Sequence, residues 1–191
     1  MTLQKTHINM RTKQKYSNVK RVFYDRHTGE RSETRLTKQQ TCFDSTAEFN
    51  CYMMISRYFQ SPMFDIDVHN TLSLGAIDWK LDFQITARRN QPLASAILAE
   101  LINTFHDTNH TSLGQIFIEY KGIQDDNFLD KMSLLATTTP MFTKTIILVS
   151  DHTTAFGCYD KKRNRFYCHP IVSSHILEAT LQNVTQSHTQ G

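Results

Sequence analysis

Hydrophobic residues recur along the chain with two spacings, and these predict both strands and helices. Apolar alternation or continuous apolar runs predict strands at residues 19–25, 30–36, 64–69, 72–74, 76–86, 116–120 and 145–150, and a hairpin at 156–159 and 165–168. Apolar residues three and four apart predict helices at 46–58, 93–105, 126–136 and 174–181. This order predicts an α/β fold in which a mixed central sheet is flanked by helices.

The two ends of the chain lack these spacings. Residues 1–17 are polar and basic, so we expect a disordered arm there, and we expect a polar tail at residues 184–191. The remaining length, residues 18–183, suits a single domain. No apolar run approaches the roughly 20 residues that cross a bilayer, and no apolar signal segment opens the chain. We therefore expect an intracellular, cytoplasmic protein that does not bind membranes.

Charge is unevenly distributed and points to a polyanionic partner. The net charge is +3 overall, but residues 1–40 carry +7 and residues 41–191 carry −4. DNA is the expected partner. Its candidate contacts are basic residues near the N-terminus and on the predicted hairpin: Lys13, Lys15, Lys20, Arg21, Lys161, Lys162, Arg163 and Arg165. A terminus that only keeps the chain soluble, or a solvated hairpin tip, would show the same charges.

Two acidic residues and a lysine lie on predicted strands that are otherwise apolar. Successive strand side chains alternate between faces, so Glu119 and Lys121 share one face, and Ile116, Ile118 and Tyr120 share the other. Asp82 lies on an earlier strand, where Leu81 and Phe83 should pack on the opposite face. Two carboxylates and an ammonium group on adjoining strands would suit Mg²⁺ and a phosphate, as phosphodiester hydrolysis requires. The alternative is a wet strand with a weak surface ion pair.

These residues resemble a known family. Leu81-Asp82-Phe83, followed by Ile118-Glu119-Tyr120-Lys121-Gly122, resembles the Asp…Glu-x-Lys signature of the PD-(D/E)xK nuclease superfamily. A proline often precedes the aspartate in that signature, whereas this chain has Leu81. The segment Phe43-Asp44-Ser45-Thr46-Ala47-Glu48 resembles the F-x-S-x-x-E opening of the first helix in phage-type and resolvase-like members. The resemblance covers about residues 41–150 and implies a restriction-endonuclease-like core.

The resemblance also implies roles for single residues. Asp82 and Glu119 would bind Mg²⁺, with Mn²⁺ as an alternative, and the Tyr120 carbonyl would add a ligand. Lys121 would hold the attacking water or stabilise the charge that develops on the phosphate. Glu48 would be a further acid at the metal, or else simply a negative charge in the first turn of a helix. Asp78 is predicted to share a face with Asp82 and could replace it as the metal ligand.

The resulting expectation is a small metal-dependent endonuclease that hydrolyses DNA phosphodiester bonds and works as a homodimer or within a larger nucleoprotein complex. A second hypothesis is a DNA-binding subunit of a recombination, transposition or phage assembly that does not cut on its own. A third hypothesis is a phosphate-binding or adaptor domain with no nucleic-acid partner.

Overall fold

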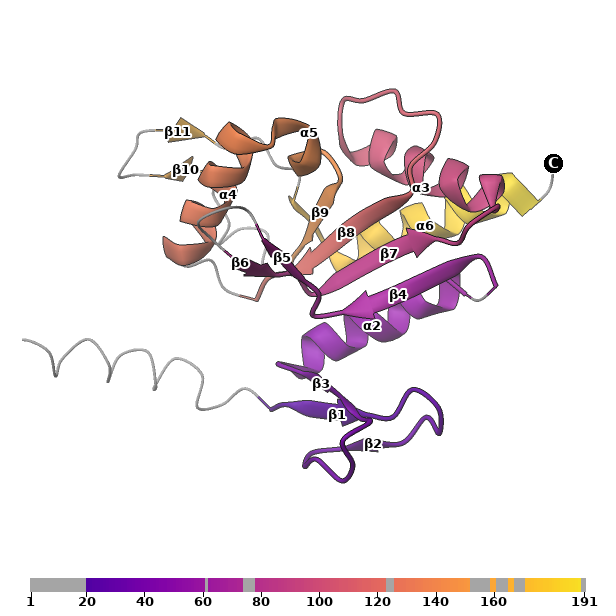
Figure 1. The fold of residues 1–191 in the computed structure, drawn as a ribbon, viewed down its shortest axis with the longest axis vertical. Coiled ribbons are helices and arrows are strands. Elements are labelled where there is room, and N and C mark those ends of the chain that lie inside the picture. The colour runs from indigo at the N-terminus through magenta and orange to yellow at the C-terminus, as the bar shows by residue number, and fades with distance from the viewer. Residues whose placement is uncertain are drawn as a thin grey trace, which may run out of the picture. The chain divides into compact units, whose positions relative to one another are not determined.

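The computed structural model describes residues 20–60, 62–73, 78–122, 126–151, 159–160, 165–166 and 171–189. The chain divides into two compact units, Met1–Asn50 and Cys51–Gly191. Figure 1 labels the elements, which follow in this order: β1 (Val22–Tyr24), β2 (Arg31–Ser32), β3 (Thr41–Phe43), α2 (Thr46–Tyr58), β4 (Phe64–Val68), β5 (Thr71–Ser73), β6 (Asp78–Lys80), β7 (Phe83–Ala87), α3 (Pro92–Phe105), β8 (Gln115–Tyr120), α4 (Asp126–Thr138), α5 (Pro140–Thr143), β9 (Ile146–Val149), β10 (Tyr159–Asp160), β11 (Arg165–Phe166), β12 (Ile171–Val172) and α6 (Ser174–Thr189).

The N-terminal unit contains a small antiparallel sheet with strand order β2-β1-β3. The predicted turn after β1 is present, and Gly29 adopts a φ of 75°, which glycine reaches without steric cost. Val22 and Phe43 are buried between the strands and the start of α2, where the Phe43 ring packs edge-on against Phe49. The sequence does not predict β3, because three residues are too few to show an alternation.

The C-terminal unit is built on a five-stranded mixed sheet with strand order β12-β9-β8-β7-β4. Strands β12, β9 and β8 run parallel to one another, whereas β8, β7 and β4 form an antiparallel meander. Parallel neighbours need a crossover, and α4 with α5 supplies it between β8 and β9. The predicted fold class, a mixed central sheet flanked by helices, is therefore confirmed.

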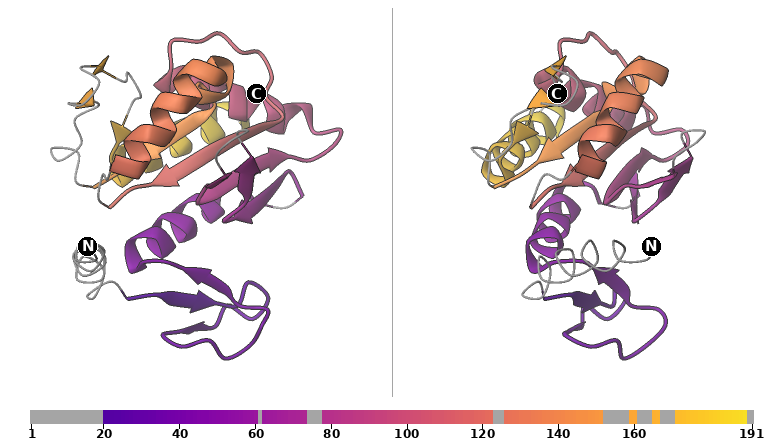
Figure 2. Two further views of the ribbon diagram at one scale, coloured as in Figure 1. Left: turned by 60° about the vertical axis from the view of Figure 1, so that its left-hand side comes forward. Right: turned by 90° about the vertical axis from the view of Figure 1, so that its left-hand side faces the viewer.

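One face of this sheet is hydrophobic and covered by helices. Helix α3 packs on β7, β8 and β9 and also against α6, and Figure 2 shows α6 and α4 on opposite sides of the sheet. Tyr52 of α2 adds to the same face, with its ring centroid 6.2 Å from that of Phe83. The strand residues that face these helices are buried: Phe64, Ile66, Phe83, Ile85, Ile116, Ile118, Tyr120, Ile147 and Val149.

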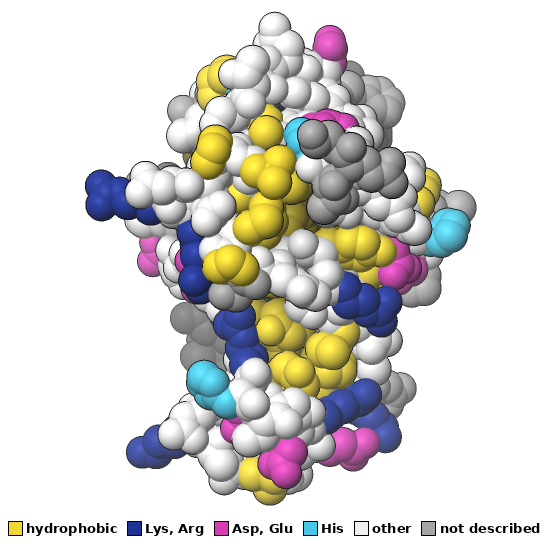
Figure 3. All heavy atoms as spheres, turned by 90° about the vertical axis from the view of Figure 1, so that its right-hand side faces the viewer, with side chains coloured by type: hydrophobic (Ala, Val, Ile, Leu, Met, Phe, Trp, Pro, Cys, Tyr) yellow, Lys and Arg dark blue, Asp and Glu magenta, His cyan; other side chains and the backbone are white. Residues whose placement is uncertain are grey.

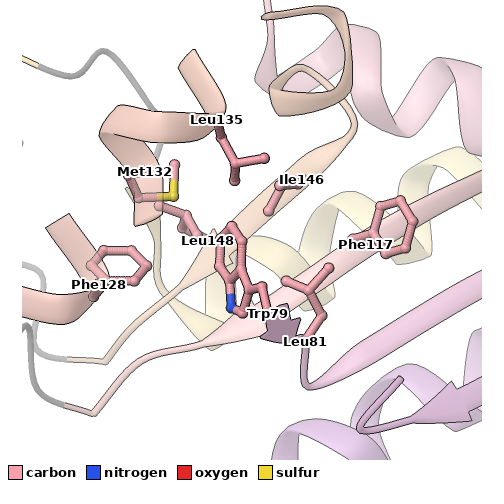
Figure 4. Packing of buried hydrophobic residues seen from close by; sticks show 8 residues of the cluster. All are labelled: Trp79, Leu81, Phe117, Phe128, Met132, Leu135, Ile146 and Leu148. Carbon is pink, nitrogen blue, oxygen red and sulfur yellow. The ribbon is translucent and has the colours of Figure 1, made fainter. Parts of the chain in front are cut away.

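The other face is covered only in part. Over β8 and β9 it packs against α4, and Figure 4 shows Trp79 of β6 at the centre of this cluster. The cluster contains Trp79, Leu81, Phe117, Phe128, Met132, Leu135, Ile146 and Leu148. Over β4, β7 and the start of β8 the same face is polar and at least partly exposed, with Asp65, Asp67, Gln84, Thr86 and Gln115. This alternation is typical of antiparallel strands with one solvated side.

The predicted strand at residues 76–86 is interrupted. Val68 pairs with Phe83 and Thr71 with Lys80, so one hairpin register runs through both strand pairs. Between them, His69 has a φ of 60° and the ladder is irregular. Consequently Leu81 packs in the α4 cluster while Phe83 lies on the other face. The expectation that Leu81 and Phe83 share a face was wrong, because the kink lies between them.

The C-terminus also differs from the prediction. Helix α6 continues to Thr189, so residues 184–189 are helical rather than a polar tail. Leu177, Leu181 and Val184 are all buried, and their i, i+4, i+7 spacing carries the apolar face beyond residue 181. None of the described helices has the length and apolar character needed to cross a membrane.

Candidate functional site

The carboxyl end of β8 brings the predicted acid and lysine together. Lys121 Nζ lies 2.6 Å from Glu119 Oε1, and both side chains emerge on the α4 face of the sheet, as the strand alternation predicts. The Glu119 side chain is 1% exposed and the Lys121 side chain 28% exposed. A buried carboxylate is costly unless it is paired and hydrogen-bonded, so this pair is more than a surface contact.

Asp82, the residue before β7, is joined to the end of β8 by two hydrogen bonds. The backbone N–H of Asp82 donates to Glu119 Oε2 at 3.1 Å. The backbone N–H of Tyr120 donates to Asp82 Oδ2 at 2.8 Å. Each carboxylate thus accepts a hydrogen bond from a backbone amide of the other segment. We call this arrangement of Asp82, Glu119 and the Tyr120 amide the carboxylate clasp.

The kink at His69 explains why the clasp forms at this point. The His69 N–H donates to the Asp82 carbonyl at 2.9 Å, and the Leu81 N–H donates to the Asn70 carbonyl at 3.0 Å. In a regular antiparallel ladder the Asp82 N–H would donate to the backbone opposite, whereas here it donates to the Glu119 carboxylate. Irregular ladder positions of this kind re-aim side chains and are frequent beside active sites.

Asp78, the alternative ligand, belongs to a different part of the hairpin. It opens β6, where it pairs with Ser73 of β5, and it is exposed. Asp82, by contrast, donates its backbone N–H to Glu119 and accepts the Tyr120 amide. The geometry therefore favours Asp82 as the partner of Glu119.

Helix α4 closes one side of the clasp. Lys121 Nζ lies 5.2 Å from the centroid of the Phe128 ring, which is buried at the start of α4. Lys131, one turn further along, lies over the Trp79 ring at 6.0 Å. Contacts between an ammonium group and a ring are favourable, and they restrict where the charge can go. The Lys121 charge is held between the Glu119 carboxylate and an aromatic face.

The Tyr120 side chain points to the opposite face, where it joins a second polar group. Its hydroxyl donates to Asp151 Oδ2 at 2.9 Å. Asp151 also accepts the Ser174 N–H at 3.0 Å and the Ser174 hydroxyl at 3.1 Å, at the start of α6. Burial first, and then the hydrogen bond and charge of Asp151, raise the pKa of Tyr120 well above its usual range. The hydroxyl therefore remains a donor at neutral pH.

Glu48, the fourth predicted acid, belongs to the N-terminal unit and caps α2. Its backbone N–H bonds to Ser45 Oγ at 3.0 Å, and its carboxylate accepts the Asp44 N–H at 2.9 Å. This is close to a capping box, in which two otherwise unsatisfied amides are paired. The structure thus gives Glu48 a local structural role, as the helix-terminus interpretation predicts.

One group of potential metal ligands is found among the described residues. It consists of Asp44, Glu48 and His69, so these side chains could hold a metal ion. Carboxylate oxygens suit Mg²⁺, whereas an imidazole nitrogen suits transition metals better. The sequence predicts Glu48 as a member of a metal site but not Asp44 or His69.

The predicted DNA contacts are only partly within the described residues. Lys13, Lys15, Lys161, Lys162 and Arg163 lie outside them, and Arg165 falls in β11. Lys20 pairs with Glu33 at 3.4 Å and Arg21 with Asp44 at 3.8 Å, both on the surface. On the face drawn in Figure 3, Lys and Arg side chains stand in several separate groups. The described residues do not test DNA binding, which therefore stays a prediction.

Sequence reasoning missed two residues beside the clasp. Asp151 comes two residues after the end of β9, and a carboxylate just beyond a buried strand was a usable signal. His69 gave no signal, because a left-handed backbone is not visible in a strand pattern. Comparison of the chain with protein-family models, with curated proteins and with solved structures finds no significant match. Its chemistry must be argued from its own residues.

Proposed function

We propose that this protein is a Mg²⁺-dependent endonuclease that hydrolyses DNA phosphodiester bonds, with Asp82, Glu119 and Lys121 at its active site. The observation that carries this proposal is the buried Glu119 carboxylate, which is paired with Lys121 and clasped to Asp82. Two carboxylates at a strand end can hold a divalent cation, and the cation together with the ammonium group can then bind a phosphate.

The donor set of the clasp fits Mg²⁺. Asp82 and Glu119 offer hard carboxylate oxygens, and one amide hydrogen bond to each of them fixes its orientation. When bound, Mg²⁺ would polarise the phosphate and supply a nucleophilic hydroxide near neutral pH. The restriction-endonuclease-like core that the sequence resembles is part of this proposal, and the order of β4, β7, β8, α4 and β9 is compatible with it.

Lys121 has the charge and the position to act on the phosphate. Its side chain is 28% exposed, and its ammonium group stands 2.6 Å from the carboxylate that would hold the metal. An ammonium group fixed before the reaction stabilises charge that develops on phosphate oxygens without reorganising at that moment. The Phe128 ring, 5.2 Å away, adds a favourable contact to the ammonium group in this position.

The test is Mg²⁺-dependent nicking of supercoiled DNA by purified protein. Lys121→Ala should lower the rate by about 10²-fold or more, because one preorganised electrostatic contact is lost, while DNA binding is largely kept. Lys144→Ala is the matched control, since Lys144 is an exposed lysine in the turn before β9, at the other end of the sheet. Wild-type protein that binds DNA without cutting it would favour the non-cutting subunit instead.

A further inference from the structure

Asp151 stands where three elements of the C-terminal unit end or begin. It follows β9, whose Val149 carbonyl accepts the Lys121 N–H at 2.8 Å. Its carboxylate takes the Ser174 N–H and hydroxyl at the start of α6 and the Tyr120 hydroxyl at the end of β8. One side chain therefore ties β8 and α6 to the end of β9.

Tyr120 connects this group to the carboxylate clasp. Its side chain is 9% exposed on the helix-covered face, whereas its backbone N–H reaches Asp82 Oδ2 at 2.8 Å. Because Tyr120 lies between Glu119 and Lys121, any rotation of its peptide unit moves both neighbours and the amide. The hydroxyl of Tyr120 is the only polar atom of its side chain, so its partner decides how firmly the strand end is held.

We propose that Asp151 is a positioning residue: through the Tyr120 hydroxyl it holds the end of β8, so that the Tyr120 amide stays on Asp82 and the Glu119–Lys121 pair stays aligned with it. This rests on the proposed function for its catalytic consequence, but the positioning itself is a property of the fold. The Tyr120 side chain, to which Asp151 bonds, lies on the face of the sheet opposite the clasp side chains, so the link from Asp151 to the clasp runs through the Tyr120 backbone.

Hydrogen exchange of the residue 82 and 120 amides, measured by NMR on the full chain, tests the positioning directly. Asp151→Ala and Tyr120→Phe should each speed exchange at both amides by about tenfold or more, since a hydrogen bond to a charged group contributes a factor of about ten to a hundred. The double variant should exchange no faster than Asp151→Ala alone, because the two changes remove one interaction. Ser174→Ala removes one contact of Asp151 but keeps the Ser174 N–H bond, so exchange at both amides should stay near wild type.

Cleavage kinetics then test the catalytic consequence. Asp151→Ala and Tyr120→Phe should lower kcat by about tenfold and leave KM for DNA unchanged, since the clasp is loosened while the DNA-binding surface is not altered. Unchanged exchange at both amides in Asp151→Ala would overturn the positioning role, whatever the activity. If the wild-type protein cuts no DNA, the proposed function fails, and the exchange data still decide whether Asp151 positions the strand end.

Discussion

At the scale of single residues, the site depends on which carboxylate reaches Glu119. Asp78 and Asp82 are four residues apart, so in a regular strand both side chains would lie on the same face. In the structure Asp82 accepts a hydrogen bond from the Tyr120 amide, whereas Asp78 is exposed in β6. A carboxylate that receives an amide bond from the neighbouring strand has a fixed direction, which an exposed one lacks. Metal binding should therefore depend on one of the two and not on the other.

We expect Asp82→Asn to abolish Mg²⁺ binding measured by calorimetry, because the amide loses the negative charge while keeping the size and an acceptor for the Tyr120 N–H. Asp78→Asn is the matched control and should bind Mg²⁺ like the wild type. Unchanged Mg²⁺ binding in Asp82→Asn would mean that the clasp is not the metal site and would direct attention to Asp44, Glu48 and His69.

At the scale of elements, the kink between the two halves of the hairpin decides where Asp82 lies. A β-branched residue is strained at the φ of 60° found at His69, whereas glycine is not. His69→Val should cost about 1–2 kcal/mol of unfolding free energy and weaken Mg²⁺ binding, as the hairpin relaxes towards a regular ladder. His69→Gly should keep both properties near wild type.

Asn90 provides the control for this prediction, since it has a φ of 64° in the turn beyond the other end of β7. Asn90→Val should lower stability by a similar amount in urea unfolding and leave Mg²⁺ binding intact. If His69→Gly lost metal binding as fully as His69→Val, the imidazole rather than the backbone conformation of His69 would be required.

Much of this element structure follows from the sequence. Helices α2, α3 and α4 and strands β4, β8 and β9 lie close to their predicted bounds, because long apolar faces and buried β-branched runs have clear periods. The shared face of Glu119 and Lys121 follows from the same strand alternation. The break at Asp82 and the contact of Tyr120 with Asp151 do not, because they depend on a backbone dihedral angle and on pairing between distant segments. The spacing of apolar residues along the chain shows neither a single dihedral angle nor a contact between distant segments.

At the scale of the whole molecule, the open part of the sheet indicates the side from which a substrate would approach. One face is covered by α3, α6 and Tyr52, while the face that carries Glu119 is polar and partly exposed over β4 and β7. Gln84 there bonds to Gln115 at 2.9 Å, and the exposed carboxylates of Asp65 and Asp67 lie on the same surface. It is not basic, and the attraction of a polyanion must come mostly from charges elsewhere on the chain.

The excess of positive charge in residues 1–40 is the natural source of that attraction. Deleting residues 1–17 removes Lys5, Arg11, Lys13 and Lys15 and no acid. Each phosphate that a cation neutralises contributes about −0.9 to the slope of log affinity against log salt for duplex DNA. The truncated protein should bind DNA more weakly, with a slope shallower by up to about 3–4 units if all four charges are engaged.

Fluorescence anisotropy over a range of salt concentrations measures this slope for the full chain and for the truncated protein. Circular dichroism should be nearly unchanged, since residues 1–17 have no apolar period that could form a core face. An unchanged slope would show that these cations do not contact DNA, and the partner would then have to be sought through the chemistry of the clasp alone.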